Sequence, residues 1–98
     1  MVNLHDDKAK IDEICRRYGV HELLLFGSGL RPEFRPDSDL DFLVDFQPDA
    51  HIGLIRFVQM AQDLEAALHR KVDLVPKRGL KPLIREGILQ HAEVIYAE

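Results

Sequence analysis

The apolar run at residues 20–26 constrains the fold more strongly than any other segment of this 98-residue chain. Its sequence is VHELLLF, and a Gly-Ser-Gly stretch ends it at residues 27–29. A short apolar run bounded by turn residues is typical of a strand that is buried inside a sheet. The run is far shorter than a membrane-spanning helix, so it predicts an inner strand that opens into a tight loop.

A second strand is predicted at residues 39–46, where apolar and acidic residues alternate. Because side chains of a strand alternate between its two faces, every second residue shares a face. The apolar face consists of Leu40, Phe42, Val44 and Phe46. The other face consists of Asp39, Asp41, Leu43 and Asp45. The alternation therefore predicts a strand with one face buried and one largely acidic.

Apolar residues at helical spacing predict three helices, at residues 5–18, 52–68 and 80–91. The apolar stripe of the second helix consists of Leu54, Phe57, Val58, Ala61, Leu64 and Leu68. The stripe of the third consists of Leu80, Leu83, Ile84, Ile88 and His91. Residues 72–75 are predicted as a short strand, whereas residues 94–96 fit either a last strand or a continuation of the third helix.

The order of these elements indicates an α/β protein in which helices flank a small mixed sheet. A chain of this length is expected to form one domain, covering residues 1–98. Its 13 Lys and Arg against 17 Asp and Glu give a net charge of −4, which argues against a protein that binds nucleic acid directly. The single cysteine allows no intrachain disulfide and the first ten residues contain no signal-peptide core. We therefore expect a cytoplasmic protein without a membrane segment.

Candidate catalytic residues lie near the ends of the predicted strands. Asp39 and Asp41 are two residues apart, so their carboxylates project to the same side, with Cα atoms about 6.7 Å apart. Asp73 lies between apolar neighbours, a costly place for an acid that faces the core, and sharing a site with the other two would explain it. Gly27 and Ser28 end a buried strand, where successive N–H groups can bind phosphate. Three carboxylates around divalent cations beside such a loop suit two-metal phosphoryl or nucleotidyl transfer.

Each of these features also has a more common interpretation. An Asp-X-Asp pair is common on solvated strand edges, a Gly-Ser pair after a strand is most often a turn, and Asp73 alone fits an exposed edge. Cys15 is expected to be a small buried apolar residue, and Asp45 a solvated one. Lys77 and Arg78 fit an exposed basic turn, or they add positive potential near a bound triphosphate. Together, and in this order along the chain, the features indicate a site for phosphoryl or nucleotidyl transfer more specifically than any one of them does.

In that order, the residues resemble the DNA polymerase beta-like nucleotidyltransferase superfamily, and the size of the chain resembles its minimal nucleotidyltransferase (MNT) branch. The loop of the family reads Gly-Ser-X-Ala-Arg-Gly, then five residues, then Ser-Asp-X-Asp. The residues that match it are Gly27, Ser28, Arg31, Ser38, Asp39 and Asp41. Leu30 and Pro32 stand where the family has Ala and Gly. The helix–strand order also matches, so the resemblance extends over essentially the whole chain.

The resemblance implies a role for each matching residue. Asp39 and Asp41 would bind two Mg²⁺ ions, and Asp73 would ligate the catalytic metal and orient or deprotonate the attacking hydroxyl. The residues implied in nucleotide binding are Gly27, Ser28, Arg31 and Ser38. MNT proteins are familiar as antitoxins paired with HEPN-domain toxins. The resemblance thus implies an antitoxin of a type VII HEPN/MNT system, which transfers AMP from ATP to a tyrosine hydroxyl of the HEPN ribonuclease toxin.

Two other functions stay open on the sequence. The chain could neutralise a HEPN toxin by complex formation alone, with an inactive nucleotide site. It could also be a subunit of a small-molecule nucleotidyltransferase, although such enzymes carry extra helices for the acceptor that this chain lacks.

Overall fold

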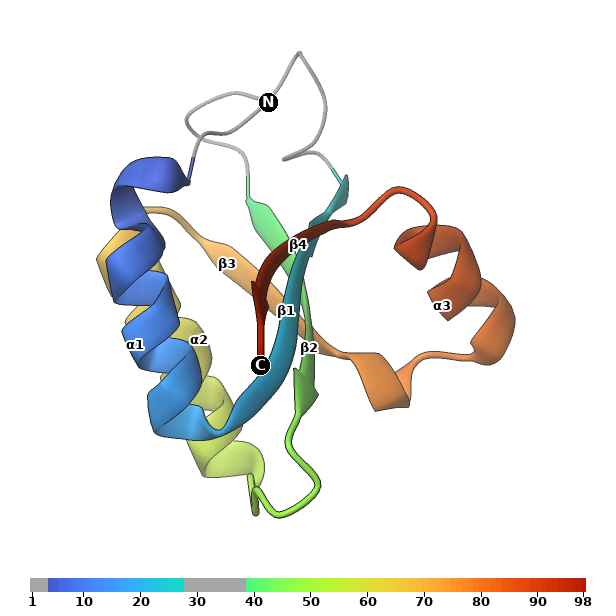
Figure 1. Cartoon of the computed structure of the whole chain (residues 1–98), viewed down its shortest axis with the longest axis horizontal. Coiled ribbons are helices and arrows are strands. Elements are labelled where there is room, and N and C mark those ends of the chain that lie inside the picture. Colours follow the sequence, from blue (N-terminus) through green and yellow to red (C-terminus); the bar gives the residue numbers. More distant parts are fainter. Residues whose placement is uncertain (1–3, 28–38) are drawn as a thin grey trace.

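The computed structural model describes residues 4–27 and 39–98, and its helices and strands follow the predicted order (Figure 1). In chain order the elements are η1 (His5–Asp7), α1 (Lys8–Tyr18), β1 (Val20–Phe26), β2 (Leu40–Phe46), α2 (Leu54–Leu68), β3 (Val72–Pro76), η3 (Lys77–Gly79), α3 (Pro82–Leu89) and β4 (Glu93–Ala97). Residues 94–96, which fitted either a strand or a helix, belong to β4. The second and third helices are shorter than predicted, by two and four residues respectively.

The four strands form one mixed sheet in the order β3–β2–β1–β4. Strand β1 pairs antiparallel with β2 and with β4, whereas β2 pairs parallel with β3. Parallel neighbours need a crossover connection, and α2 supplies it between β2 and β3. The predicted architecture, a small mixed sheet flanked by helices, is confirmed.

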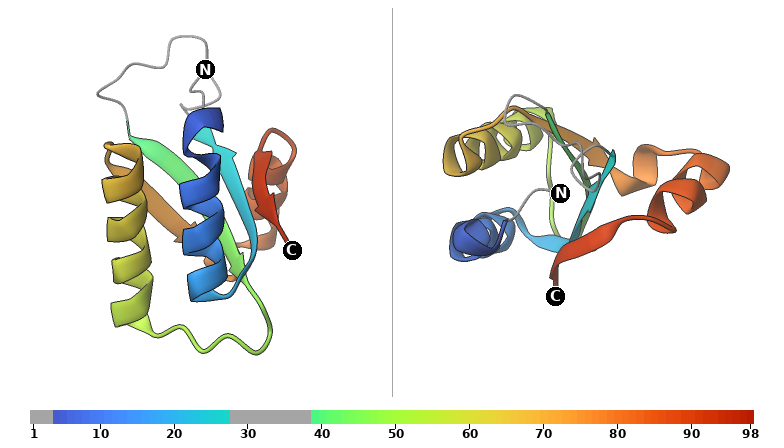
Figure 2. Two further views of the ribbon diagram at one scale, coloured as in Figure 1. Left: turned by 60° about the vertical axis from the view of Figure 1, so that its left-hand side comes forward. Right: turned by 90° about the horizontal axis from the view of Figure 1, so that it is seen from above.

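The main core lies between the sheet and helices α1 and α2, which cover the same face of it (Figure 2). The apolar face predicted for residues 39–46 points into this core: three of its side chains are buried and Phe46 packs against them. Cys15 is fully buried, as predicted. The helical residues buried in the core are Ile11, Ile14, Cys15, Tyr18, Met60, Leu64 and Leu68.

The predicted apolar stripe of α2 is only half correct. Leu64 and Leu68 are buried, but Leu54 is 79% exposed and Val58 is 46% exposed. Met60, which lay outside the predicted stripe, is fully buried. Met60 and Leu64 are four residues apart and centre the buried face, so α2 turns the flank with Leu54 and Val58 toward solvent.

The apolar stripe predicted for the third helix does not pack into the core. No residue of α3 is buried, and Leu83 is 85% exposed. The reason is topological, because α3 lies on the side of the sheet opposite to α1 and α2 (Figure 2). Within residues 4–27 and 39–98, no helix has both the length and the apolar content that crossing a membrane requires.

The second face of the sheet is not simply acidic. Leu43, predicted to share this face with three aspartates, is fully buried, and its partner in the antiparallel pairing with β1 is Leu24, which is also buried. Neither residue belongs to the core under α1 and α2, whereas their neighbours Phe42 and Leu25 do. A small apolar centre therefore interrupts the polar side chains of this face.

Candidate active site

The candidate site lies where β1 ends and β2 begins. Gly27 follows β1, and Asp41 is the second residue of β2. Three of the predicted nucleotide-binding residues, Ser28, Arg31 and Ser38, lie between these strands and outside the described residues. Their role therefore stays a prediction, and the geometry of the site comes from Gly27 and the aspartates.

Asp41 and Asp73 are brought side by side by the parallel pairing of β2 and β3. The two residues are direct partners in the register of these strands. Their neighbours Leu40, Phe42 and Leu74 point into the core, so both carboxylates project from the opposite face. Asp41 is half-buried and Asp73 is exposed. Strand alternation thus explains why Asp73 lies between apolar neighbours in the sequence. The register of β2 and β3 places Asp73 next to Asp41, as the sequence predicted.

Gly27 makes room for the carboxylate of Asp41. Its φ of +73° lies in the left-handed region, which side chains other than glycine rarely adopt. A Cβ placed on Gly27 would lie 2.5 Å from Oδ2 of Asp41, closer than Cβ atoms approach other atoms in real structures. The missing side chain of Gly27 is therefore what allows the chain to pass this close to the carboxylate.

The carboxylates of Asp41 and Asp73 are the hard oxygen ligands that Mg²⁺ prefers. Asp39 is exposed and lies just before β2, two residues from Asp41. In the part of the chain that the structure describes, however, no three His, Cys, Asp or Glu side chains gather closely enough to hold a metal ion. Two carboxylates about 5 Å apart repel each other by roughly 3 kcal/mol at an effective dielectric constant near 20. The donor chemistry and the pairing of Asp41 with Asp73 fit Mg²⁺, and a site shared by all three aspartates stays a prediction.

Asp45 does not belong to the site and is not solvated, which corrects the sequence interpretation. Its side chain is 17% exposed, and its Oδ1 lies 3.3 Å from Nε of Arg78. That oxygen is buried and accepts no hydrogen bond from the described residues, so the positive charge of Arg78 is what compensates it. Asp45 lies four residues beyond Asp41, about 13 Å along the strand.

Lys77 and Arg78 form ion pairs with two acids on the second face of the sheet. Glu22 of β1 and Asp45 of β2 are direct cross-strand partners, and two acids opposite each other destabilise a sheet. Nζ of Lys77 donates a hydrogen bond to Oε1 of Glu22 at 3.2 Å, while Arg78 pairs with Asp45. Both cations are thus bound to neighbouring strands. The exposed basic turn that the sequence favoured holds for Arg78, whose side chain is 75% exposed, but not for Lys77, whose side chain is 25% exposed.

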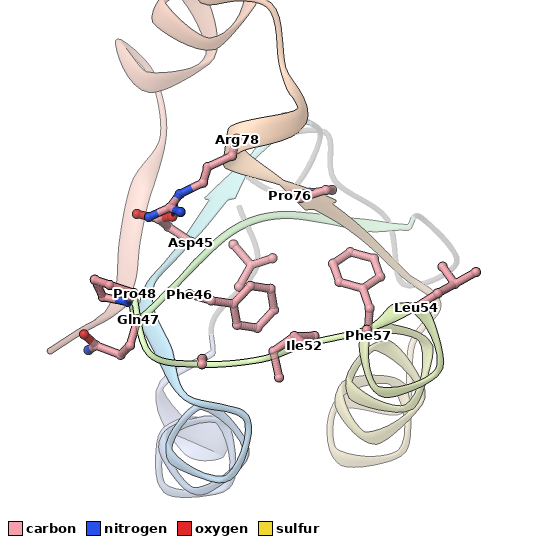
Figure 3. A pocket seen from close by; sticks show the side chains of 12 residues that line it. Asp45, Phe46, Gln47, Pro48, Ile52, Leu54, Phe57, Pro76 and Arg78 are labelled. Carbon is pink, nitrogen blue, oxygen red and sulfur yellow. Dashed lines mark ion pairs between the residues drawn. The ribbon is translucent and has the colours of Figure 1, made fainter.

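A cavity of about 520 Å³ lies at the other end of β2, away from Asp41 (Figure 3). Figure 3 shows the side chains of Phe46 and Phe57 next to it, and their ring centroids lie 6.4 Å apart in an edge-to-face arrangement. The other labelled residues that line it are Asp45, Gln47, Pro48, Ile52, Leu54, Pro76 and Arg78. Its lining is mainly apolar and lacks paired carboxylates, so it does not replace the site at Asp41.

Comparison with known proteins agrees with this geometry. A family model described as a nucleotidyltransferase domain matches residues 8–95. The chain belongs to the nucleotidyltransferase domain family. Protein adenylyltransferase MntA of Thermococcus cleftensis is 43% identical over 84 residues, which cover 86% of this chain and 81% of that protein.

Two solved structures have the fold of this nucleotidyltransferase. A structure assigned as a minimal nucleotidyltransferase is 37% identical with a TM-score of 0.78, and the match covers 92% of this chain and 90% of the other. A chain from the complex of a tri-AMPylated Shewanella oneidensis HEPN toxin with an MNT antitoxin is 21% identical with a TM-score of 0.71, covering 98% of this chain and 74% of that one. The predicted polymerase beta-like fold and the enzyme class are both confirmed.

Sequence reasoning missed one residue of this nucleotidyltransferase that takes part in the ion pairs on the second face of the sheet. Glu22 carries no local signal, because it is a single acid within an apolar run. Its role becomes visible only when β1 and β2 pair and place it beside Asp45, where Lys77 and Arg78 bind the two acids. A pattern along one strand cannot reveal such a cross-strand pair.

Proposed function

We propose that this nucleotidyltransferase transfers AMP from ATP to a tyrosine hydroxyl of a partner HEPN ribonuclease, and that it thereby acts as the antitoxin of a type VII HEPN/MNT pair. The relative in Thermococcus cleftensis is a protein adenylyltransferase, and the Shewanella oneidensis complex joins an AMPylated HEPN toxin with an MNT antitoxin. Both names agree with the reaction that the resemblance implies. The structural observation that carries the proposal is the in-register pair of Asp41 and Asp73 beside Gly27.

The residues of the site suit this reaction. Asp39, Asp41 and Asp73 would hold Mg²⁺, which supplies a Lewis acid that lowers the pKa of a nearby hydroxyl. Asp73 is exposed on its strand, so an acceptor on another molecule can reach it. A tyrosine hydroxyl, with an ordinary pKa near 10, ionises more readily than the hydroxyl of serine. Gly27, together with Ser28, Arg31 and Ser38, would hold the phosphates of ATP, and the β- and γ-phosphates would leave as pyrophosphate when the tyrosine oxygen bonds to the α-phosphorus.

The decisive experiment is the intact mass of a HEPN protein encoded in the adjacent reading frame after incubation with this chain, ATP and Mg²⁺. We expect a mass increase of one or more AMP groups on tyrosine, together with loss of RNA cleavage. Asp41→Asn should remove the transfer while the chain stays folded. An unmodified partner, with the wild-type chain folded and bound to nucleotide, would refute the proposal.

Neutralisation by complex formation alone is the second candidate, and the exposed apolar residues of α3 favour it. The two functions differ in what Asp41→Asn does in cells. If transfer neutralises the toxin, this variant fails to protect cells from it. If binding is sufficient, the variant protects as well as the wild-type chain.

A further inference from the structure

Helix α3 has an apolar face that residues 4–27 and 39–98 do not cover. Leu83 is 85% exposed and Ile84 is 53% exposed, and none of the eight residues of the helix is buried. Isolated helices shorter than about 12–15 residues are marginally stable in water, so packing stabilises most short helices. Contiguous exposed apolar residues often mark an interaction site. The exposure of this helix therefore indicates that another molecule packs on it.

The position of α3 relates this face to the candidate active site. The helix follows directly after Lys77 and Arg78, which are bound to Glu22 and Asp45 on the second face of the sheet. Asp41 projects from that same face, whereas α1 and α2 cover the other one (Figure 2). A molecule that packs on α3 would thus lie on the side of the sheet from which an acceptor must approach.

The charge of this segment differs from that of the whole chain. Residues 77–85 contain four Lys or Arg and no Asp or Glu, although the net charge of the chain is −4. Lys77 and Arg78 are bound by acids of the sheet. Lys81 and Arg85 are four residues apart, so they share one flank of the apolar face, and within the described ranges neither side chain makes an ion pair. The apolar face is therefore bordered by positive charge on the flank of Lys81 and Arg85, whereas the one acid of α3, Glu86, lies three residues from Leu83 on the other flank.

We propose that α3 is the docking site for the protein that receives the nucleotide, and that the segment of that protein on α3 is an amphipathic helix with apolar residues flanked by Asp or Glu. The identity of this partner rests on the proposed function. Leu83 and Ile84 would pack into the apolar stripe of the partner helix, and Lys81 and Arg85 would pair with its acids. Docking at α3 would hold the acceptor hydroxyl beside the carboxylates while Asp41 and its neighbours bind nucleotide.

A second exposed apolar surface, on the first two turns of α2, provides a matched control. It consists of Leu54, Ile55 and Val58, and Leu54 is 79% exposed. These residues belong to α2, the helix that with α1 covers the face of the sheet opposite to the one from which Asp41 projects (Figure 2). The lone Lys or Arg of α2, Arg56, lies 4.7 Å from the ring centre of Tyr18 and is thus bound within the chain. The apolar surface of α2 therefore lacks a counterpart to Lys81 and Arg85, which make no ion pair with the described residues.

The test compares Leu83→Glu with Leu54→Glu in binding to the HEPN protein of the adjacent reading frame, measured by titration calorimetry. Both side chains are highly exposed, so both variants should fold, and a thermal melt verifies it. We expect Leu83→Glu to raise Kd at least about 30-fold, as loss of an interface hot spot does, and Leu54→Glu to leave it unchanged. Lys81→Glu combined with Arg85→Glu should slow association about tenfold at low salt and reduce its dependence on salt.

The possible outcomes separate this inference from the proposed function. If Leu83→Glu weakens binding but the wild-type chain transfers no AMP, the docking site stands and the reaction fails. If the wild-type chain transfers AMP and Leu83→Glu binds as tightly as it does, the docking site is wrong. A loss of binding in Leu54→Glu instead would move the interface to α2 and overturn the proposal. Sedimentation of the chain alone gives a further refutation, namely a dimer that Leu83→Glu dissociates.

Discussion

Replacing Gly27 by alanine is the sharpest test of how the site is built. The residue has a φ of +73°, and its Cβ would lie 2.5 Å from Oδ2 of Asp41. Ordinary contacts begin near 3.4 Å, so the carboxylate would have to move by about 1 Å. We therefore expect Gly27→Ala to damage both the backbone conformation and the position of Asp41.

The two effects have different sizes. A left-handed conformation costs a residue other than glycine about 1–2 kcal/mol, so the free energy of unfolding should fall by that amount. For a protein of this size, each kcal/mol lowers Tm by about 4–8 °C. A displacement of about 1 Å at a reacting group costs about 100-fold in rate. The loss of activity should therefore greatly exceed what the loss of stability explains.

Gly19→Ala is the matched control for the backbone effect. Gly19 ends α1 with a φ of +71°, and a Cβ there would lie 3.0 Å from Cβ of Ala50, away from any candidate site residue. Both variants should lose similar stability in urea denaturation. Only Gly27→Ala should lose AMP transfer, measured with labelled ATP at a temperature well below both Tm values. Equal transfer by the two variants would refute the argument that Gly27 is needed to position Asp41.

Three other changes test separate parts of the structure. Asp73→Asn should reduce the rise in Tm that we expect Mg²⁺ and ATP to cause in the wild-type chain, whereas Asp45→Asn should keep it; equal melting shifts in both variants would contradict the site. Arg78→Ala leaves a buried oxygen of Asp45 uncompensated, so urea denaturation should detect a loss of about 1–3 kcal/mol in the free energy of unfolding. Arg85→Ala should lose less than about 0.5 kcal/mol, because Arg85 makes no ion pair with the described residues. Burial raises the pKa of the Cys15 thiol from 9.0 to about 12, so the unfolded chain ionises first as pH rises. Stability should therefore fall above pH 9, with about 1.4 kcal/mol of the loss at pH 10 due to this thiol. Cys15→Ala should remove that part when urea midpoints at pH 8 and 10 are compared, and the smaller fall that remains is expected from Tyr18 and Tyr96, whose pKa values are also raised.

The sequence by itself determined the positions of the first three strands and the core-facing side of the second, whereas it left residues 94–96 open between a strand and a helix. The alternation at residues 39–46 correctly predicted the buried face of β2 and the outward direction of Asp41. The order of the Gly-Ser loop and the three aspartates was sufficient for the family, since such motifs are local in sequence. The period of side chains along one element is a local property, and it survives folding unchanged.

Tertiary structure decided which residues meet across elements. The pairing of Asp41 with Asp73 depends on the register between β2 and β3, which are separated by the whole of α2. Glu22 and Asp45 become partners in the same way, and they bind Lys77 and Arg78 from a segment that follows β3. No pattern within one strand contains this information, because register follows from the packing of distant segments.

The apolar faces of the helices show most clearly what the sequence determines and what only the tertiary structure decides. Helical spacing correctly predicted that α2 and α3 each have an apolar side, but it could not predict what covers that side. Packing against the sheet covers Met60 and Leu64 of α2 and leaves Leu54 exposed. The path of the chain through Lys77 and Arg78 carries α3 to the opposite face, where Leu83 is left in solvent. A hydrophobic period shows that a surface favours burial, whereas the connection between elements determines whether this chain or another molecule buries it.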